Sequence, residues 1–391
     1  MNPFKFYVPT RLVIEAGCVS SLGTMLAKQG VKSALIVTDR GVIKAGCVSK
    51  VLSSLEDSGI GDEVYDGVEQ NPSEENVKEA LAMLSRNGYG AIVAVGGGSA
   101  IDTAKAVVAM MIEKVDIRDL YSREVVGKAP IILVAVPTTA GTGSEVTRSA
   151  VITNKEARVK ETIRGECLYP KIALVDPELT ISLPRSITAS TGMDAFTHAI
   201  EAYTTRNAHA LSDALAIEAT RLIFANLRKA VSDGSDIEAR SNMCVASTLA
   251  GMAFSISGLG MVHAMAEPLG GRFNVPHGVA NSILLSYCLN YNCDAVSKKL
   301  AFLARVLGLR SSYDEEDSRS VEDAAVAVVE AVRKLSADVG IPHRIQKVTV
   351  TKMEFNDLVG DALKNSCLPA NPKKASREDL KRTYAMVLDV E

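Results

Sequence analysis

Residues 91–105 read AIVAVGGGSAIDTAK, in which a short β-branched run passes through three glycines into a helix-like segment. An uninterrupted apolar run of this length is typical of a strand buried on both faces of a sheet. Glycines let the backbone approach a phosphate, and free amide groups at a helix start bind anions. The stretch departs from the usual GxGxxG pattern, because Ile101 stands in place of the third glycine. It therefore predicts a strand–turn–helix unit, whose glycines form either a phosphate-binding loop or only a tight turn.

The same alternation of strand-like and helix-like segments recurs through the N-terminal part of the chain. Further apolar runs predict strands at residues 34–38, 131–136 and 172–175. Residues 73–86 predict a helix between two of them, with Ser73 as its N-cap. Such alternation is typical of a parallel sheet with right-handed crossovers. The first residues, 4–8 and 11–15, are separated by Pro9 and Thr10 and predict a small hairpin.

The kind of secondary structure that the sequence predicts changes near Leu183, in a segment that contains Pro177 and Pro184. Strand-like runs nearly disappear, and amphipathic stretches predict helices at residues 211–232, 237–255, 320–339 and 376–388. The last of these begins with a capping-box pattern, and the acidic residues 314–317 predict a solvated turn. We therefore predict an α/β, Rossmann-like nucleotide-binding domain over residues 1–183 and an all-α domain over residues 184–391.

Composition narrows the class of protein. The chain of 391 residues is 47% hydrophobic and carries a net charge of −3 with mixed signs, which argues against nucleic acid as the main partner. Its first residues lack the apolar run of a signal peptide, and its longest apolar stretch, near residues 104–112, is too short to cross a bilayer. The seven cysteines are dispersed without a CxxC pair, which is typical of reduced thiols in a cytoplasmic protein. We therefore expect a cytoplasmic protein with neither a nucleic-acid nor a membrane partner.

A second polar loop follows another predicted strand. Residues 136–145 read VPTTAGTGSE, and the hydroxyls and backbone amides of this segment suit a phosphate, a ribose or an amide. Two such loops at the carboxyl ends of neighbouring strands are typical of a nucleotide crevice in an open α/β sheet. The two loops together favour the phosphate-binding interpretation of the glycines at 96–98.

Asp39 ends the first long strand and predicts the choice of nucleotide. A carboxylate there can accept both hydroxyl hydrogens of an adenosine ribose and would repel a 2′-phosphate, which favours NAD over NADP. In the ordinary Rossmann order this acid follows the glycine loop, whereas Asp39 precedes Gly96 by 57 residues, so we expect a different topology. The simpler alternative is that Asp39 only caps a helix.

Three of the five histidines and one aspartate form a pattern that suits a metal ion. Asp194 and His198 are four residues apart and face the same side of a predicted helix, and His263 and His277 follow in glycine-rich segments. One carboxylate with three imidazoles suits Fe, Zn or Mn better than Mg or Ca, which prefer oxygen ligands. The remaining histidines, His209 and His343, are interpreted as surface or loop residues.

A metal beside a nicotinamide cofactor indicates redox chemistry between alcohols and aldehydes, since a metal polarises the alcohol oxygen while hydride passes to the nicotinamide. The alternatives are a polyol dehydrogenase or a phosphate-eliminating synthase with the same fold. A non-catalytic nucleotide-binding scaffold is a further alternative, which the intact set of metal ligands disfavours.

These motifs resemble the iron-containing, group III alcohol dehydrogenases, and the resemblance covers essentially the whole chain. It is carried by GGGSAIDTAK at 96–105, PTTAGTGSE at 137–145, GMDAFTHAIE at 192–201 and HGVAN at 277–281. The resemblance implies a dehydroquinate synthase-like fold, with the metal, Fe(II) or sometimes Zn(II), in a cleft between the two domains. It also implies transfer of a hydride between NAD(H) and a small alcohol, diol or aldehyde, by a homodimer or higher oligomer.

The resemblance also assigns residues to roles. Asp194, His198, His263 and His277 match the metal ligands. The positions that match or fall near the nucleotide are Asp39, Asn71, Gly97, Gly98, Ser99, Thr138, Thr139, Thr142, Lys160 and Leu179. Phe254 and Cys367 fall near the expected substrate pocket.

One residue departs from the family pattern. Many members carry a second histidine where this chain has Glu267, and that histidine is a candidate proton relay. A carboxylate can also relay a proton, so Glu267 is the predicted catalytic residue. It can alternatively bind the metal, pair with a cationic group of the substrate, or form an ion pair with Arg272.

Overall fold

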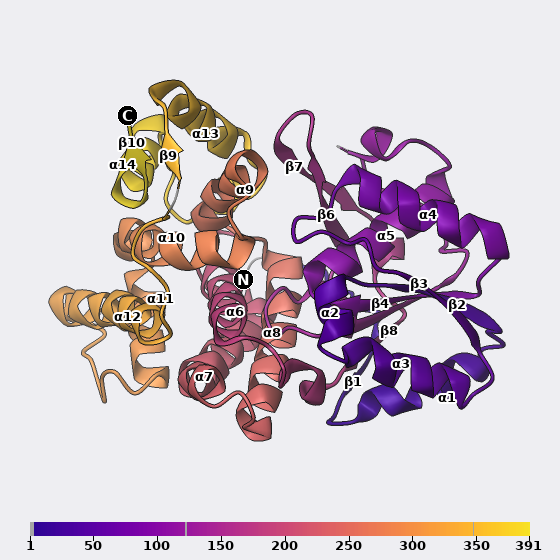
Figure 1. Ribbon diagram of the computed structural model, residues 1–391. Helices are drawn as coiled ribbons and strands as arrows, with labels where there is room; N and C mark the ends of the chain where they lie inside the picture. Colours follow the sequence, from indigo (N-terminus) through magenta and orange to yellow (C-terminus); the bar gives the residue numbers. More distant parts are fainter. Residues whose placement is uncertain (1–3, 122, 347) are drawn as a thin grey trace.

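The computed structural model describes residues 4–121, 123–346 and 348–391. Its central feature is a six-stranded, fully parallel sheet in the order β1-β8-β5-β4-β2-β3, drawn in indigo and purple on the right of Figure 1. The strands of the described chain are β1 (Arg11–Ile14), β2 (Ser33–Val37), β3 (Gly61–Tyr65), β4 (Ala91–Gly96), β5 (Ile132–Pro137), β6 (Ser149–Asn154), β7 (Val159–Arg164), β8 (Ile172–Val175), β9 (Thr349–Val350) and β10 (Asp389–Val390).

Helices cover both faces of this sheet, which explains the unbroken apolar runs of its strands. Leu35 and Ile92 pack on one side with α4 and α5, while Ile36 and Val93 pack on the other with α1 and α3. Since successive side chains of a strand point to opposite faces, a strand covered on both sides has no polar face. The helices of this part are α1 (Leu22–Ala27), α2 (Arg40–Lys44), α3 (Cys47–Glu56), α4 (Glu74–Asn87) and α5 (Gly98–Glu113).

The predicted N-terminal hairpin is wrong. Residues 11–14 form β1, which pairs in parallel with β8, and residues 4–10 contain no strand. The turn signal at Pro9 and Thr10 is local, whereas the open edge of β8 offers a complete row of backbone partners. The hairpin of the sheet part is instead β6–β7, which is antiparallel and extends beside α9 (Met261–Phe273) at the top of Figure 1.

The second half of the chain is helical, and the parallel sheet followed by helices confirms the predicted fold class. The predicted helices at 211–232, 237–255, 320–339 and 376–388 correspond to α7, α8, α12 and α14, and the capping box of Ser376 with Asp379 is present. The division into separate domains at residues 183 and 184 stays a prediction. The helices of this part are α6 (Arg185–Thr204), α7 (Ala210–Ser232), α8 (Ile237–Ser257), α9 (Met261–Phe273), α10 (His277–Asn292), α11 (Ser297–Val306), α12 (Ser318–Asp338), α13 (Lys352–Lys364) and α14 (Arg377–Val387).

Single-turn 3₁₀ helices complete the described chain at Cys18–Ser21, Ile117–Leu120, Ser144–Val146, Glu166–Leu168, Pro177–Thr180, Cys293–Val296 and Leu368–Ala370. The acidic segment at 314–317 is an exposed turn, and Asp317 caps α12 by accepting a hydrogen bond from the amide of Arg319. All seven cysteines are unpaired.

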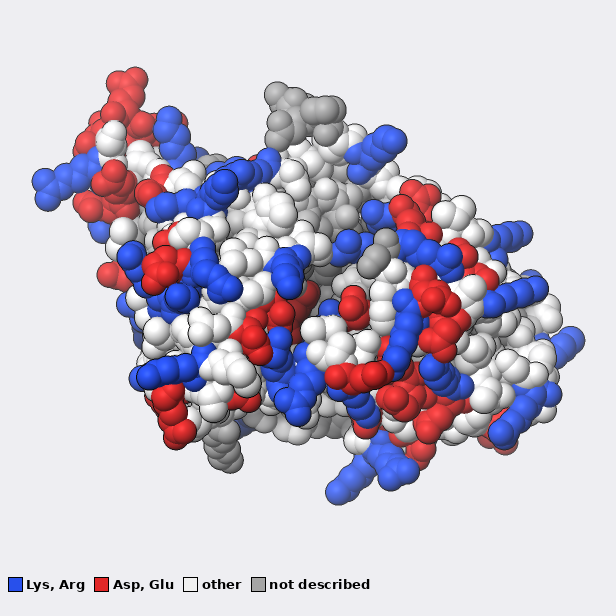
Figure 2. All heavy atoms as spheres, turned by 90° about the horizontal axis from the view of Figure 1, so that it is seen from above, with Lys and Arg blue, Asp and Glu red and all other residues white. Residues whose placement is uncertain are grey.

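Within the described residues, no single helix has the length and apolar character needed to cross a bilayer, although α8 and α9, bent by 103°, meet that criterion as a pair. Positive and negative side chains are interspersed over the face shown in Figure 2.

Candidate metal and nucleotide site

A cavity of about 690 Å³ lies between the sheet part and the helical part. Its wall on the sheet side includes Asp39, the glycines after β4 and the threonines after β5, while its opposite wall comes from α6, α8, α9 and α10. The carboxyl ends of β4 and β5 open into it, as expected for the ligand crevice of an open α/β sheet.

The predicted metal ligands converge on one end of this cavity. Asp194, His198, His263 and His277 each offer one ligand atom, and the four atoms lie within 4.8 Å of one another. The first two lie on successive turns of α6, and His263 and His277 come from the first turns of α9 and α10. Gly278 permits this convergence, because a Cβ there would lie 2.6 Å from the backbone oxygen of Ser190 on α6.

Second-layer hydrogen bonds orient two of the imidazoles. His198 Nδ1 lies 3.2 Å from the carbonyl oxygen of Gly141, and His263 Nδ1 lies 2.6 Å from Oε2 of Glu201. Both acceptors hold the proton on Nδ1, so Nε2 keeps its lone pair. The sequence interpretation gave Glu201 no role, although its spacing from Asp194 and His198, seven and three residues, places it on the same helix face.

The environment of the cluster sets its protonation. Burial lowers the pKa of His198 to about 4 and lowers that of His277 well below its ordinary value. Burial alone would raise the pKa of Asp194, but the neighbouring imidazoles and Asn281 outweigh it and lower that pKa. Burial would lower the pKa of His263, yet the Glu201 carboxylate raises it. The Asp194 carboxylate and the neutral imidazoles of His198 and His277 are therefore present near neutral pH, as cation binding requires, whereas the raised pKa of His263 means that a cation must displace its proton.

The side chain of Asn281 provides a test of whether these residues fit a cation. Its Nδ2 lies 2.6 Å from Oδ1 of Asp194 and 3.0 Å from Nε2 of both His263 and His277. An electropositive amide group thus lies where three acceptor atoms converge, and Asn281 Oδ1 is buried without a partner among the described residues. The donor set of three nitrogens and one oxygen fits Fe(II) or Zn(II). The sequence interpretation missed Asn281, which is four residues after His277 on α10.

The glycine loop lies against the threonine loop. Gly97 and Gly98 begin α5, where a Cβ would lie 3.3 Å from Oγ1 of Thr139 and 2.9 Å from Cγ2 of Thr142, respectively. A side chain at Gly98 would therefore displace Thr142, and one at Gly97 would press on Thr139, so the glycines let the two loops stack closely. Ser99, Thr138 and the two contacting threonines all line the cavity.

A buried polar network fixes the distance between these loops. Lys105 Nζ donates to the carbonyl oxygen and Oγ of Ser144, to Oγ1 of Thr147 and to the carbonyl oxygen of Ser149. Asp102 accepts from Oγ of Ser144 at 2.6 Å and from the amide of Val151 at 3.0 Å. Both charged residues come from α5, so the network connects this helix to the threonine loop and to β6. The sequence interpretation did not predict this network.

Asp39 caps a helix and also borders the cavity, and its ribose-binding role stays a prediction. Oδ1 accepts a hydrogen bond from the amide of Val42 at 3.0 Å and caps α2, and the residue also lines the cavity. The cap occupies one carboxylate oxygen, so the side chain remains able to meet a ribose.

Asn71, Leu179 and Lys160 line the same cavity. Asn71 donates to Oδ1 of Asn274, which connects the sheet part to the end of α9. Lys160 reaches from β7 across Gly270, where a Cβ would lie 2.7 Å from its Cε.

The two predicted substrate residues differ in position. The Phe254 ring stacks on the imidazole of His198 with centroids 4.5 Å apart, and it lines the cavity. Cys367 does not line the cavity, and burial raises the pKa of its thiol well above the ordinary range.

Glu267 lies one helical turn after His263 and lines the cavity, outside the four-atom metal group. The alternative ion pair with Arg272 is wrong, because Arg272 pairs with Asp361 at 2.6 Å and Asp357 at 3.3 Å. Five residues of α-helix turn a side chain by roughly 140° relative to the first, so Arg272 faces away from Glu267.

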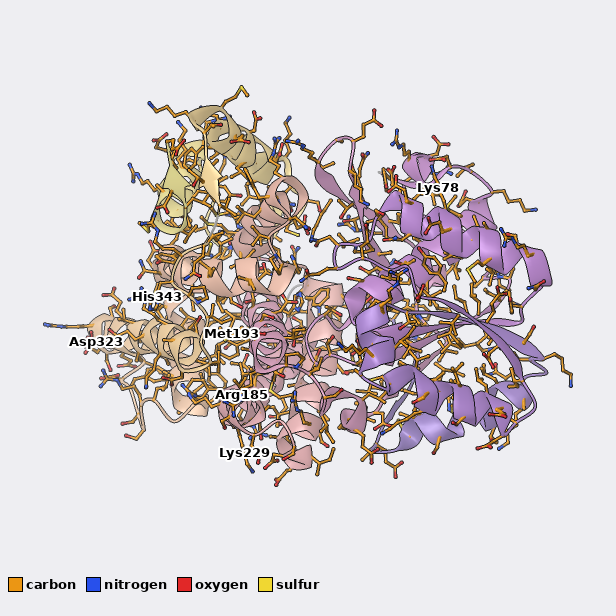
Figure 3. The ribbon with its side chains drawn as sticks, in the orientation of Figure 1. Lys78, Arg185, Met193, Lys229, Asp323 and His343 are labelled. Carbon is orange, nitrogen blue, oxygen red and sulfur yellow. The ribbon has the colours of Figure 1, made fainter. Side chains whose placement is uncertain are left out.

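The two histidines outside the cluster also differ. The surface interpretation of His209 is wrong, because its side chain is buried, caps α7 by accepting from the amide of Ser212, and stacks on Phe4. The predicted position of His209 in a loop agrees with its role as a cap, since a cap residue precedes its helix. The burial of His209 depends on tertiary packing, which the local sequence does not show. His343 is exposed at the outer side of the helical part (Figure 3).

Comparisons with known proteins agree with this geometry. Residues 9–177 match the model of iron-containing alcohol dehydrogenase, and residues 188–388 match the C-terminal model of the same family. The chain is 40% identical over 383 residues to a 1,3-propanediol dehydrogenase of Citrobacter freundii, with 97% of this chain and 98% of that protein covered. It is 35% identical over 376 residues to an NAD-dependent methanol dehydrogenase of Bacillus methanolicus, covering 96% and 97%. The crystal structure of a 1,3-propanediol oxidoreductase superposes with a TM-score of 0.92 and 40% identity, covering 98% of this chain and 99% of that one.

A nucleotide crevice that shares its cavity with an aspartate–trihistidine group defines a metal-dependent oxidoreductase of alcohols. The chain belongs to the iron-containing alcohol dehydrogenase family. This membership confirms the predicted resemblance, the predicted enzyme class and the predicted use of NAD with a metal.

Proposed function

We propose that the protein interconverts small primary alcohols or diols and their aldehydes with NAD(H), using Fe(II), or alternatively Zn(II), held by Asp194, His198, His263 and His277. The observation that carries this proposal is the position of those four residues in the same cavity as the glycine loop and Asp39. Relatives named for 1,3-propanediol and for NAD-dependent methanol oxidation support the same substrate class.

The residues on the sheet side would position the cofactor. Backbone amides of Gly97, Gly98 and Ser99 at the start of α5 would bind the pyrophosphate, since a helix N-terminus favours an anion. The Asp39 carboxylate would bind the adenosine ribose and repel a 2′-phosphate. The threonine loop, with Asn71, Lys160 and Leu179, would hold the remainder of the nucleotide in the cavity.

The residues on the helical side would position the alcohol. When bound, the metal supplies Lewis acidity that polarises the alcohol oxygen. Phe254 packs over His198 and limits the space available to water beside the ligands. Glu267 lines the same end of the cavity, where a carboxylate can take up the released proton.

The proposal is tested by purifying the protein without oxygen, measuring its metal content, and screening short aldehydes with NADH and short alcohols with NAD. We expect one metal ion per chain and turnover of at least one aldehyde. The substitutions His263→Ala and His277→Ala should abolish both bound metal and turnover, whereas His343→Ala, on the exposed surface, should preserve both. Absence of turnover across the panel with either metal would contradict the proposal and favour a polyol dehydrogenase, another enzyme with this fold, or a nucleotide-binding scaffold.

We further propose a homodimer or higher homo-oligomer, a cytoplasmic location, and a domain boundary between residues 183 and 184. These proposals rest on the family resemblance and on the change of sequence texture near Leu183. Light scattering on the purified protein tests the first, and a monomer at micromolar concentration would refute it.

A further inference from the structure

We propose that Glu267 makes the end of the cavity select alcohols and aldehydes that carry a second hydroxyl group. This inference rests on the proposed alcohol–aldehyde function. It concerns the part of the substrate away from the reacting oxygen.

The Glu267 side chain lies on the same face of α9 as a metal ligand. Glu267 is four residues after the metal ligand His263 on α9, so both lie on the same face of the helix. Both residues line the cavity, together with Phe254 and Leu259. A substrate whose oxygen meets the ligand group can therefore reach Glu267 with its other end within the same cavity.

A hydrogen bond from Asn365 holds the Glu267 carboxylate in one orientation. Its Oε2 accepts a hydrogen bond from Nδ2 of Asn365, whose own Oδ1 accepts from the amide of Cys367 at 2.9 Å. Asn365 is thus held at both ends of its amide group. Within the described residues this is the hydrogen bond that Glu267 makes, so Oε1 keeps its acceptor capacity in a residue that lines the cavity.

A positive charge lies near the Glu267 carboxylate in the cavity. Lys160 reaches the cavity from β7 and lies against α9, where a Cβ on Gly270 would be 2.7 Å from its Cε. Burial lowers the pKa of its ammonium group, while Glu267 and Asp194 oppose that shift. The nearby Lys160 and a divalent ion at the ligand cluster would both repel a cationic substrate group. A neutral hydroxyl group is therefore a better partner for Glu267 than an ammonium group.

An ionised carboxylate accepts hydrogen bonds and donates none. A hydroxyl group on the substrate would satisfy Oε1, whereas a methyl group would remove water from it and leave it without a donor. The same side chain thus favours a diol over an alcohol with an apolar tail.

The test compares 1,3-propanediol with 1-butanol, which has the same number of heavy atoms and a methyl group in place of the second hydroxyl. The wild-type protein, Glu267→Gln and Glu267→Leu are measured in two ways. One is kcat/KM with NAD, and the other is calorimetric binding of each alcohol to the metal-loaded protein–NADH complex, in which no turnover occurs. Metal content is measured for every variant.

We expect Glu267→Leu to lower the ratio of diol to 1-butanol, in kcat/KM and in calorimetric affinity, by roughly tenfold to a hundredfold. Loss of a proton acceptor would lower kcat for both alcohols alike and leave this ratio unchanged. Glu267→Gln keeps an acceptor oxygen and should lose roughly threefold to tenfold for the diol. Asn365→Ala, which releases the carboxylate from its support, should cause a smaller loss in the same direction. Bound metal should stay at the wild-type level, because Glu267 is outside the ligand group.

An unchanged ratio of diol to butanol in Glu267→Leu would overturn the inference. An equal fall of kcat for both alcohols with unchanged affinities would also overturn it, and would instead support a proton-relay role. If the wild-type protein turned over no member of the aldehyde and alcohol panel, the proposed function would fail, and the calorimetric preference for the diol would still decide this inference.

Discussion

The structure predicts that Glu201 controls metal affinity through His263, and the substitution Glu201→Gln tests this. The two oxygens of the buried carboxylate accept from His263 Nδ1 at 2.6 Å, from the amide of Val262 at 2.8 Å and from the amide of His263 at 3.4 Å. All of these partners are donors. Glutamine has the same shape but one acceptor oxygen, so its NH₂ group must face a donor.

The magnitude follows from these contacts. One buried donor loses its acceptor and the remaining bonds lose their charge assistance, which together lower the free energy of unfolding by about 2–4 kcal/mol. If the NH₂ group faces the imidazole, His263 shifts its proton to Nε2 and loses the lone pair that faces the ligand group. Loss of such an outer partner lowers metal affinity by roughly tenfold to a hundredfold.

The assay is a competition for metal with a chromogenic chelator, together with urea denaturation of the metal-free protein. The matched control is Glu238→Gln, an exposed carboxylate in the first turn of α8, which should change neither quantity. The reasoning would be refuted if Glu201→Gln bound metal with wild-type affinity and unfolded at the same urea concentration.

Three further predictions follow from other parts of the site. Asp39→Asn keeps an acceptor for the α2 cap but removes the negative charge. The preference for NAD over NADP, measured as the ratio of the two kcat/KM values, should therefore fall roughly tenfold. An unchanged ratio would show that Asp39 does not select the cofactor. Lys105→Met removes the cation that donates hydrogen bonds to the threonine loop. It should lower the free energy of unfolding by about 3–5 kcal/mol and weaken NAD binding. An unchanged free energy of unfolding in urea would contradict a structural role for the network. Burial lowers the pKa of His198 to about 4 in the metal-free protein, whereas the pKa in the unfolded chain is the ordinary 6.5. Between these two pH values the unfolded chain binds more protons than the folded one. The contribution of His198 to the free energy of unfolding should therefore fall by about 2–3 kcal/mol as pH drops from 7 to 4.5. His198→Gln should reduce that pH dependence in urea denaturation, and an identical slope in both proteins would argue against it.

Local sequence patterns were sufficient for the four central strands β2, β4, β5 and β8, for the helices α4, α7, α8, α12 and α14, and for the ligand types. The unbroken apolar runs at β2, β4, β5 and β8 predict strands covered on both faces, because burial on both sides leaves no polar alternation. Asp194 and His198 share a helix face through their spacing alone. The glycines before α5 identify a close approach of backbone, although the sequence does not show that Thr139 and Thr142 are what they approach.

Contacts between distant segments decided the remainder. The edge of β8 pairs with β1 in place of the local hairpin, because that edge offers a full row of backbone partners. His209 carries no sequence signal of its burial against Phe4. The support of His263 by Glu201 joins α9 to α6 across 62 residues, and no local pattern encodes such a distance.

The sequence by itself determined which chemical groups are present, because residue type fixes whether an atom accepts, donates or binds a metal. The tertiary structure decided which of them meet. Three helices must cross before Asp194, His198, His263 and His277 lie within 4.8 Å, and the crossing depends on Gly278 allowing α10 to touch α6. The same crossing places Glu267 at the cavity wall and turns Arg272 away from it, so the sign of the charge beside the substrate depends on helix rotation as well as on composition.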